Sequence, residues 1–203
     1  MIIDKVEKVN ELSLEEIRQK LPDDREFLAK NATRYAVTLH DPMSIPEAAF
    51  AACFSLVETN MKKMYKEAEC GWSASDKRVE MREPPTRYLI ASAESAPDTV
   101  AGFVSYQIDW EQDMAVAYCY ELQLDKSAQR LGLGRWLMSI LEHMGRRADV
   151  EKTMLTVFTA NKAALQFYTS IGYEEDETSP QPVKLRSGKE RRADYMILSK
   201  RLR

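Results

Sequence analysis

The stretch that decides the fold is YCYELQL at residues 118–124, followed closely by QRLGLG at residues 129–134. The first part alternates and is rich in aromatic and branched side chains, which is typical of a β-strand. The second part is a turn that contains Gly132 and Gly134, and it runs into RWLMSILEHM at residues 135–144. We expect this last segment to be an α-helix.

A strand, a glycine turn and a helix N-terminus in this order form a binding site for anions. The first helical N–H groups have no intrahelical partner, and the helix dipole adds about half a positive charge there. Glycine lets the backbone approach a pyrophosphate without an intervening side chain. The spacing Gln-x-x-Gly-x-Gly differs from the Gly-x-Gly-x-x-Gly of dinucleotide-binding folds, and no Gly-Lys-Ser/Thr follows as in a P-loop. The same spacing also occurs in ordinary turns, so the function depends on the rest of the chain.

The composition excludes several classes of protein. The 203 residues suit one domain, and the net charge of -3 indicates no general attraction to nucleic acid. No apolar run is long enough for a membrane span, and the first residues lack the apolar region of a signal peptide. Three cysteines and two histidines are too few and too scattered for a disulfide framework or a metal site. We therefore expect a reduced, intracellular protein with no metal and no direct contact with nucleic acid or membranes. We also expect a monomer, although nothing in the composition indicates the oligomeric state.

Hydrophobic spacing and turn residues predict alternating helices and strands. A charged segment with spaced apolar residues predicts a helix that ends near Leu21, and we expect a polar loop over residues 73–85. Further helices are expected over 47–69, 135–144 and 161–170, and strands over 34–40, 87–93, 100–110, 114–124, 153–158 and 195–198. The sequence SIPE at residues 44–47 predicts a capping box before the first of these helices. The resulting prediction is an N-terminal helical extension at residues 1–30 and a single α+β domain at residues 31–203, with a mixed central sheet flanked by helices.

Two motifs in this order of elements resemble the acetyltransferases of the GNAT superfamily. The first is Gln129-x-x-Gly132-x-Gly134 after a strand, which resembles their pyrophosphate loop for acetyl-coenzyme A. The second is NKAALQFY at residues 161–168, which is followed by Ile171-Gly172-Tyr173. The resemblance implies the GNAT acyl-CoA N-acyltransferase fold, with the first helix as an N-terminal strap, and acetyl-CoA as the acetyl donor.

Other stretches resemble one branch of this superfamily, the N-alpha-acetyltransferase D enzymes. They comprise TNM at 59–61, Met64-Tyr65, Gly71-Trp72, RYLIA at 87–91, YCYELQL at 118–124 and MLTVF at 154–158. This branch acetylates the amino terminus of histones 4 and 2A, which begin Ser-Gly-Arg-Gly. The resemblance therefore implies histone N-terminal peptides as partners, direct transfer in a ternary complex, and residence in the cytoplasm and nucleus. The chain departs from the branch at Cys70, where animal members carry an aromatic residue.

Acetyl transfer from a thioester to an amine needs a neutral amine, an oxyanion stabiliser and an acid for the leaving thiolate. By composition alone Glu121 is a solvent-facing strand residue, but its place in the strand before the glycine turn favours it as the general base. In a regular strand Tyr120 and Glu121 face opposite sides, so we expect a β-bulge that re-aims one of them. Tyr168 matches the tyrosine that protonates the thiolate in many superfamily members, and Tyr120 is the alternative acid.

The resemblance also implies binding residues for both substrates. The expected coenzyme residues are Leu122, Gln123, Leu124, Gln129, Arg130, Leu131, Gly132, Leu133, Gly134, Arg135 and Asn161. The expected peptide residues are Tyr65, Trp72, Asp109, Trp110, Glu111, Tyr118, Tyr120, Thr156, Thr178 and Tyr195. The backbone of Leu122 and Leu124 should pair with the pantetheine amides, and Asp109 and Glu111 with the cationic groups of the peptide. Without the resemblance, the aromatic residues would be assigned to the core and residues 109–111 to a solvated turn.

Two other functions fit the same sequence. The first is acetylation of internal lysines or of small amines on the same fold. The second is a catalytically silent acyl-CoA-binding module, against which the presence of Glu121, Gly132 and Gly134 argues.

Overall fold

The structure is a computed structural model that describes residues 2–184 and 190–202. Its helices are α1 (Ile2–Asn10), α2 (Leu14–Arg18), α3 (Glu47–Glu67), α4 (Ala74–Glu80), the 3₁₀ helix η1 (Lys126–Ala128), α5 (Leu133–Arg147) and α6 (Lys162–Ser170). Its strands are β1 (Glu26–Leu28), β2 (Arg34–His40), β3 (Arg87–Ala93), β4 (Ala96–Glu111), β5 (Met114–Leu124), β6 (Lys152–Phe158), β7 (Glu174–Glu175), β8 (Val183–Lys184), β9 (Glu190–Arg191) and β10 (Tyr195–Arg201). No helix among the described residues is long and apolar enough to cross a membrane.

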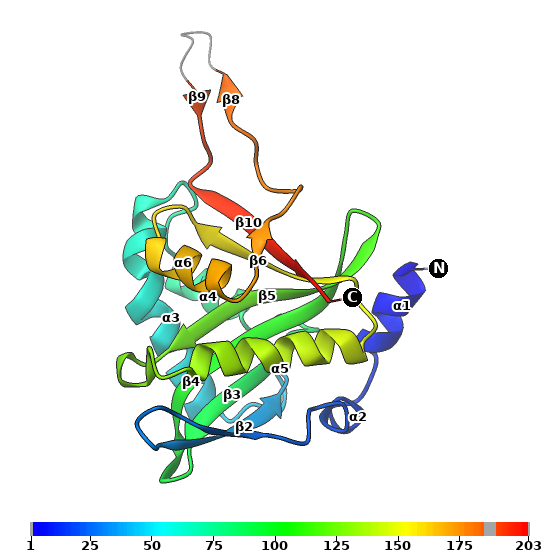
Figure 1. The fold of residues 1–203 in the computed structure, drawn as a ribbon, viewed down its shortest axis with the longest axis vertical. Helices are drawn as coiled ribbons and strands as arrows, with labels where there is room; N and C mark the ends of the chain where they lie inside the picture. Colours follow the sequence, from blue (N-terminus) through cyan, green and yellow to red (C-terminus); the bar gives the residue numbers. More distant parts are fainter. Residues whose placement is uncertain (1, 185–189, 203) are drawn as a thin grey trace.

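One large mixed sheet organises the molecule. Within the described residues it has eight strands in the order β1-β2-β3-β4-β5-β6-β10-β7 (Figure 1). β5 and β6 run parallel, and the neighbouring pairs on either side are antiparallel. The predicted α+β fold, a mixed sheet flanked by helices with a helical N-terminal segment, is confirmed. The short hairpin of β8 and β9 stands away from this sheet (Figure 1).

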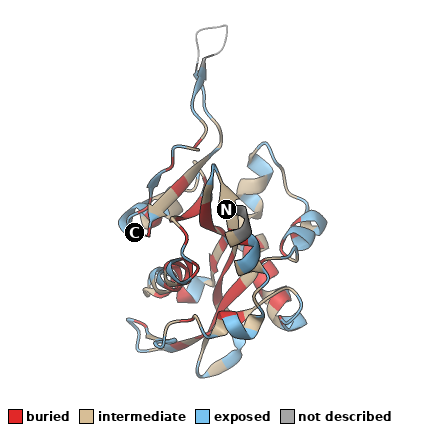
Figure 2. Cartoon of the chain, turned by 90° about the vertical axis from the view of Figure 1, so that its right-hand side faces the viewer, coloured by how far each residue is buried: buried red, intermediate tan, exposed pale blue. Residues whose placement is uncertain are grey.

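Helices cover both faces of the sheet, and each face has its own apolar cluster. Along β3, Leu89 and Ala91 join the cluster under α1, α2, α5 and α6, whereas Tyr88 and Ile90 join the cluster under α3. This alternation is the period of two that a strand with both faces covered must have. The buried residues accordingly follow the strands and the inward faces of the helices (Figure 2).

Two irregularities in β5 shape the centre of the sheet. Ser105 of β4 pairs with Glu121, and Tyr106 pairs with Cys119, so Tyr120 is the extra residue of a β-bulge. The expected bulge is therefore confirmed. On its other edge, β5 pairs with β6 only as far as Cys119 and Leu155, after which the two strands part (Figure 1).

Three local predictions were wrong. The polar loop expected at residues 73–85 contains helix α4, whose N-terminus is capped by the Ser73 side chain. The capping box expected before α3 does not form, because the Ser44 hydroxyl accepts a hydrogen bond from Asp41 N instead and Pro46 is the N-cap. The single helix expected to end near Leu21 is two helices, since Ser13 and Glu16 form a capping box that starts α2.

A buried ion pair joins β6 to the turn after β7. The Nζ atom of Lys152 lies 2.6 Å from the Oδ2 atom of Asp176, and both side chains are buried. The Oδ1 atom of Asp176 accepts hydrogen bonds from the backbone and hydroxyl of Thr178. Burial alone would raise the pKa of Asp176, but Lys152 and the neighbouring hydroxyl groups hold it well below its usual range.

We predict that Asp176→Asn lowers the free energy of unfolding by about 3–5 kcal/mol near neutral pH, because it leaves Lys152 buried without a carboxylate. The folded-state pKa of Asp176 is depressed, so the pair contributes fully above the unfolded pKa of about 3.9 and is lost as the pH falls below it. Urea unfolding of both proteins at several pH values should show the difference shrinking toward acid. Glu174→Gln, at an exposed carboxylate in β7, is the control, and an unchanged stability of Asp176→Asn would contradict the prediction.

Candidate active site

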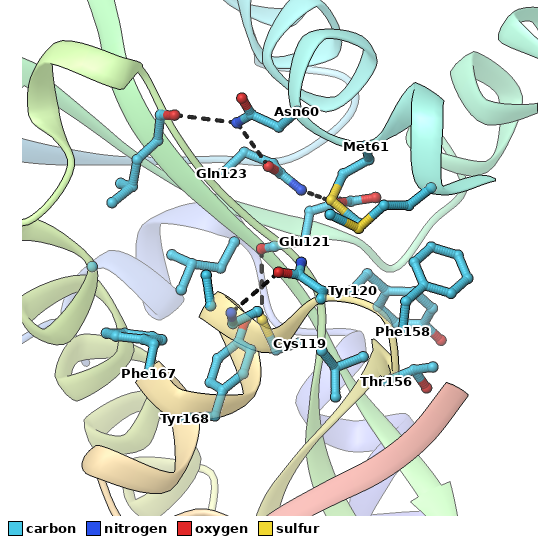
Figure 3. Close-up of a pocket in the computed structure, with 18 of the residues that line it drawn as sticks. Asn60, Met61, Cys119, Tyr120, Glu121, Gln123, Thr156, Phe158, Phe167 and Tyr168 are labelled. Carbon is cyan, nitrogen blue, oxygen red and sulfur yellow. Dashed lines mark hydrogen bonds between the residues drawn. The ribbon is translucent and has the colours of Figure 1, made fainter. Parts of the chain in front are cut away.

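A cavity of about 920 Å³ opens where β5 and β6 part. It is lined by the second half of β5, the loop after it, and residues of α3, α4, β6 and α6. Figure 3 shows the side chains that these elements direct toward it. The parted strands therefore convert the middle of the sheet into a site with two ends, one at the glycine loop and one at the aromatic residues of α3 and β5.

The first end is formed by residues 129–135, which we call the coenzyme loop. Gly132 adopts a left-handed conformation with φ of 100° and is the N-cap of α5 without a side-chain partner for the helix. Gln129, Gly132, Gly134 and Arg135 all border the cavity. The first turn of α5 thus presents backbone N–H groups and a partial positive charge, which fits the pyrophosphate of acetyl-CoA.

Strand β1 supports the coenzyme loop from outside. The Phe27 ring stacks on Trp136 of α5 with ring centroids 5.5 Å apart. A Cβ atom added at Gly132 would lie 2.9 Å from the Phe27 ring. Lys30, which follows β1, borders the cavity beside the loop. The cradle therefore needs a glycine at position 132 for space as well as for its backbone conformation.

Glu121 lies between the two ends of the cavity and is only 5% exposed. Its Oε1 atom is 2.7 Å from the Nζ atom of Lys77, and its Oε2 atom accepts a 2.8 Å hydrogen bond from Gln123. The Gln123 side chain accepts in turn from Asn60 of α3, as Figure 3 shows. The carboxylate is thus fixed from both sides, and it is not the solvent-facing residue that composition alone would favour.

Lys77 of α4 is a buried lysine with three oxygen neighbours. Its Nζ atom is 2.7 Å from Glu121 Oε1, and it donates hydrogen bonds to Glu80 Oε1 at 2.7 Å and to the Tyr65 hydroxyl at 3.2 Å. Burial alone would lower the pKa of Lys77, but the Glu121 carboxylate, with Tyr65 and Glu80, raises it far above its usual value. The lysine is therefore a permanent cation beside Glu121.

The second end consists of Tyr65, Tyr118, Tyr120 and Thr156, and we call it the peptide mouth after the substrate that the sequence resemblance predicts there. The hydroxyl groups of Tyr118 and Thr156 are 2.5 Å apart, and the ring of Tyr118 lies against Tyr120. Tyr120 is 40% exposed, and its hydroxyl donates to Asp109 at 3.4 Å. Burial raises the pKa of Tyr65, Tyr118 and Tyr120, so these phenols stay protonated at physiological pH.

Helix α6 contributes Tyr168 and Asn161 to the cavity. Burial raises the pKa of Tyr168 well above its usual value, so this hydroxyl is protonated and available as a donor. The Asn161 side chain accepts a 3.1 Å hydrogen bond from Ala164 N and caps the helix. Its carbonyl oxygen is therefore engaged in the cap, which leaves the amide nitrogen as the part suited to a ligand.

Most residues expected from the sequence border this one cavity. They are Tyr65, Glu111, Tyr118, Tyr120, Glu121, Leu122, Gln123, Leu124, Gln129, Arg130, Gly132, Gly134, Arg135, Thr156, Asn161 and Tyr168. The Leu124 carbonyl accepts hydrogen bonds from Asn60 and Gln129, so a pantetheine amide that pairs with this carbonyl would share it with these protein donors or displace them.

The other expected residues lie outside the cavity lining. Leu133 is fully buried in the core, and Trp110 packs against the same apolar cluster. The Trp72 ring packs against the Tyr65 ring, with centroids 5.5 Å apart, and the Thr178 hydroxyl donates a hydrogen bond to Asp176. The remaining three residues flank the site. Leu131 packs against the apolar core, and Asp109 accepts a hydrogen bond from Tyr120. Tyr195 of β10 pairs with Phe158 of β6.

Several cavity residues were missed by sequence reasoning. They include Lys30, Asn60, Lys77, Glu80 and Phe167. Lys77 and Glu80 were missed because their helix was expected to be a loop. Asn60 was missed because its helix was predicted from the spacing of its apolar residues. A polar residue that interrupts the apolar face of such a helix was the available signal for a site residue.

A second, smaller cavity of about 110 Å³ adjoins Glu121 and Tyr120 beside the bulge. Polar side chains line it, among them Thr86, Ser105 and Gln107. Its size and lining suit a few water molecules. No group of three or more metal-ligating side chains occurs in the described ranges, 2–184 and 190–202.

A curated relative is similar over part of the chain. The mycothiol acetyltransferase of Nocardia farcinica (strain IFM 10152) is 30% identical over 106 residues, which are 51% of this chain and 35% of that protein. The match thus spans about a third of the relative's length.

Solved structures with low identity share the fold. The ribosomal-protein-S18-alanine N-acetyltransferase from Escherichia coli has a TM-score of 0.53 and 20% identity, over 82% of this chain and 94% of that chain. The NatC complex bound to Gag peptide and CoA has a TM-score of 0.59 and 17% identity, over 83% of this chain and 99% of that chain. An acetyltransferase from Streptococcus agalactiae 2603 has a TM-score of 0.60 and 14% identity, over 82% of this chain and 98% of that chain.

The family model for acetyltransferases matches residues 49–173, which include α3, the parted strands, the coenzyme loop and α6. This range is more than half of the chain and contains both ends of the cavity. The chain therefore belongs to the acetyltransferase (GNAT) family, whose members use acetyl-CoA.

Proposed function

We propose that the protein is an N-alpha-acetyltransferase that transfers acetyl from acetyl-CoA to the N-terminal amine of proteins that begin Ser-Gly-Arg-Gly, as histones 4 and 2A do. The observation that carries the proposal is the buried carboxylate of Glu121, which lies between the coenzyme loop and the peptide mouth. As part of the same proposal, the protein acts as a monomer in the cytoplasm and nucleus.

An N-terminal amine suits a site with one fixed carboxylate. Such an amine has a pKa of about 7.7–8.0, so roughly a third of it is already neutral near pH 7.5. A lysine side chain, with a pKa of about 10.4, is neutral in only about one molecule in a thousand at that pH. A carboxylate paired with a cation is a weak base, and it can serve the α-amine far more readily than lysine.

The proposed reaction is direct transfer within a ternary complex. The coenzyme loop would hold the pyrophosphate, and the thioester would then lie beside Glu121, which lines the same cavity. As the amine nitrogen forms a bond to the carbonyl carbon and the carbon–sulfur bond breaks, Glu121 would accept the amine proton and then release it to solvent. Tyr168, or Tyr120 in its place, would donate a proton to the leaving sulfur and regain one from solvent.

Acidic residues near the peptide mouth support a basic peptide. Glu80 and Glu111 border the cavity, and Asp109 lies behind Tyr120. Carboxylates of this kind can form charge-assisted hydrogen bonds with the peptide ammonium and with an arginine at its third position. The aromatic rings of the peptide mouth can pack against the short Ser-Gly backbone.

The similarity to a mycothiol acetyltransferase supports a second candidate, a small amine as acceptor. A small acceptor would need only the part of the cavity near Glu121. A peptide acceptor would use the peptide mouth, so changes there would alter its rate of acetylation, whereas a small amine would be acetylated at the same rate with or without those contacts.

We predict that a peptide beginning Ser-Gly-Arg-Gly with a free N-terminus is acetylated on its α-amine. The same peptide with a blocked N-terminus and an internal lysine should not react, because its amines are almost fully protonated. Replacing the third residue by alanine should lower kcat/KM about tenfold, since one charge-assisted contact is lost. Mass spectrometry with fragment assignment measures each product.

Small primary amines and a peptide of unrelated sequence with a free N-terminus complete this panel. Acetyl groups on the lysine of the blocked peptide would exclude the N-terminal assignment. Equal rates for the arginine and alanine peptides would exclude the histone-type specificity, and faster transfer to small amines would favour the second candidate.

We predict that Glu121→Gln lowers kcat by about a hundredfold or more, because the general base is removed. Its Kd for acetyl-CoA, measured by calorimetry, should stay within about threefold of the wild-type value, since that affinity comes from the coenzyme loop. Glu94→Gln, at an exposed position after β3, is the matched control. Retention of wild-type turnover by Glu121→Gln would remove Glu121 from the mechanism.

We predict that Gly132→Ala weakens acetyl-CoA binding by about tenfold, because alanine is strained at the positive φ and its Cβ would meet the Phe27 ring. The matched control is Gly172→Ala, which imposes similar backbone strain at φ of 90° but meets only the flexible end of Lys200. Calorimetric Kd values for acetyl-CoA distinguish the two variants. Equal affinities would mean that the coenzyme loop does not hold the coenzyme.

A further inference from the structure

The cation beside the proposed base comes from an element with no recognisable motif. Helix α4 is short and polar, yet it directs Lys77 inward so that only 6% of the side chain is exposed. A buried lysine is rare and costly unless its charge is compensated. Lys77 is compensated by hydrogen bonds to Glu80 and Tyr65 and by an ion pair with Glu121 at 2.7 Å.

The charges in this cluster do not cancel completely. Two carboxylates, Glu121 and Glu80, face one ammonium at 2.7 Å each. One negative charge therefore remains at the cavity wall, where the ammonium of a substrate would arrive. Without Lys77, two carboxylates would lie close together at the edge of a buried site, and one of them would take up a proton at a higher pH.

The geometry also fixes the direction of the Glu121 carboxylate. Gln123 holds one oxygen and Lys77 the other, and Gln123 is itself held by Asn60. Rotation of the carboxylate would therefore break its hydrogen bond to Gln123 on β5 and its ion pair with Lys77 on α4, while Asn60 of α3 keeps Gln123 in place. A base held in this way is preorganised for proton transfer.

We propose that Lys77 is a positioning residue for the acetyl transfer: its ammonium keeps Glu121 ionised and holds the carboxylate in one orientation at the cavity. This inference rests on the proposed role of Glu121 as the base. A purely structural ion pair between α4 and β5 would affect stability but not the pH dependence of the reaction.

Other ionisable groups face Glu121 from each neighbouring element. They are Tyr65 on α3, Glu80 on α4, Tyr88 on β3, Cys119 on β5 and Tyr168 on α6, each within electrostatic range of Glu121 or Lys77. Burial raises the pKa of Tyr65, Tyr88, Cys119 and Tyr168, so they are neutral in the acid range. Glu80 is the other carboxylate in contact with Lys77, which makes Glu80→Gln a necessary second background for the measurements.

The test compares Lys77→Met with Lys77→Arg and with the control Lys63→Met, which removes a lysine that is 87% exposed on α3. Rates with the free Ser-Gly-Arg-Gly peptide are measured from about pH 5 to about pH 9. The substrate amine, with a pKa of about 7.7–8.0, sets the upper break of kcat/KM in every variant. The second break, at lower pH, should lie about one pH unit or more higher in Lys77→Met than in wild type, and kcat should fall at least about tenfold with little change in peptide KM. Lys77→Arg should restore the position of this lower break, and a lower break that does not move in Lys77→Met overturns the proposal.

A second readout does not depend on the substrate. In protein labelled with ¹³C at the glutamate carboxyl groups, the Glu121 signal is assigned by its absence in Glu121→Gln and titrated by NMR. Its apparent pKa should be higher in Lys77→Met than in wild type, in both the native and the Glu80→Gln backgrounds, and an unchanged value overturns the proposal. If the wild type acetylates no N-terminal peptide, the proposed function fails, while this titration still decides whether Lys77 controls Glu121.

The double variant Lys77→Met/Glu121→Gln covers the case in which Lys77→Met does not fold, because it leaves no unpaired carboxylate at position 121. If Lys77 acts through Glu121, the double variant should be no slower than Glu121→Gln alone. A further loss of about tenfold in the double variant would show that Lys77 acts independently of Glu121 and would overturn the proposal.

Discussion

The parting of β5 from β6 is the constraint on which the site depends. Two parallel strands that stop pairing in mid-sheet leave backbone N–H and C=O groups without their usual partners, and these groups then need hydrogen bonds from side chains, water or a ligand. In this protein side chains from α3 and the coenzyme loop meet part of that need, since Asn60 and Gln129 both donate to the Leu124 carbonyl. The opening is therefore a built part of the fold, and a substrate arm entering it must compete with or replace these protein contacts.

The bulge at Tyr120 complements this opening. The extra residue in β5 leaves Tyr120 partly exposed and Glu121 buried, and both side chains border the same cavity. The buried carboxylate then needs a cation, and α4 supplies it across the sheet face. Backbone irregularity and electrostatic compensation are thus linked, because the bulge would bury an unpaired charge if α4 were absent.

The fold and the coenzyme loop could be predicted from the sequence because their signals are local. The Gln-x-x-Gly-x-Gly spacing, the alternation in β5 and the Asn161 cap each occupy a few neighbouring residues. Helix α4 could not be predicted in this way, because ASDKRVE shows no apolar stripe and its one inward lysine finds its partner 44 residues later in Glu121. Strand β1 has three residues, which is too short for a periodic pattern, and it exists through pairing with β2. Substrate choice rests on resemblance and chemistry, since the aromatic residues of the peptide mouth look like core residues in the sequence.

The contact between Phe27 and Gly132 shows that the coenzyme loop is not a self-sufficient module. Its glycine is matched to a ring that arrives from a strand about a hundred residues earlier in the chain. The two positions are therefore sterically coupled: a larger residue at one is compatible only with a smaller residue at the other. A loop grafted onto another scaffold without the segment that carries Phe27 would keep the motif and lose its outer wall.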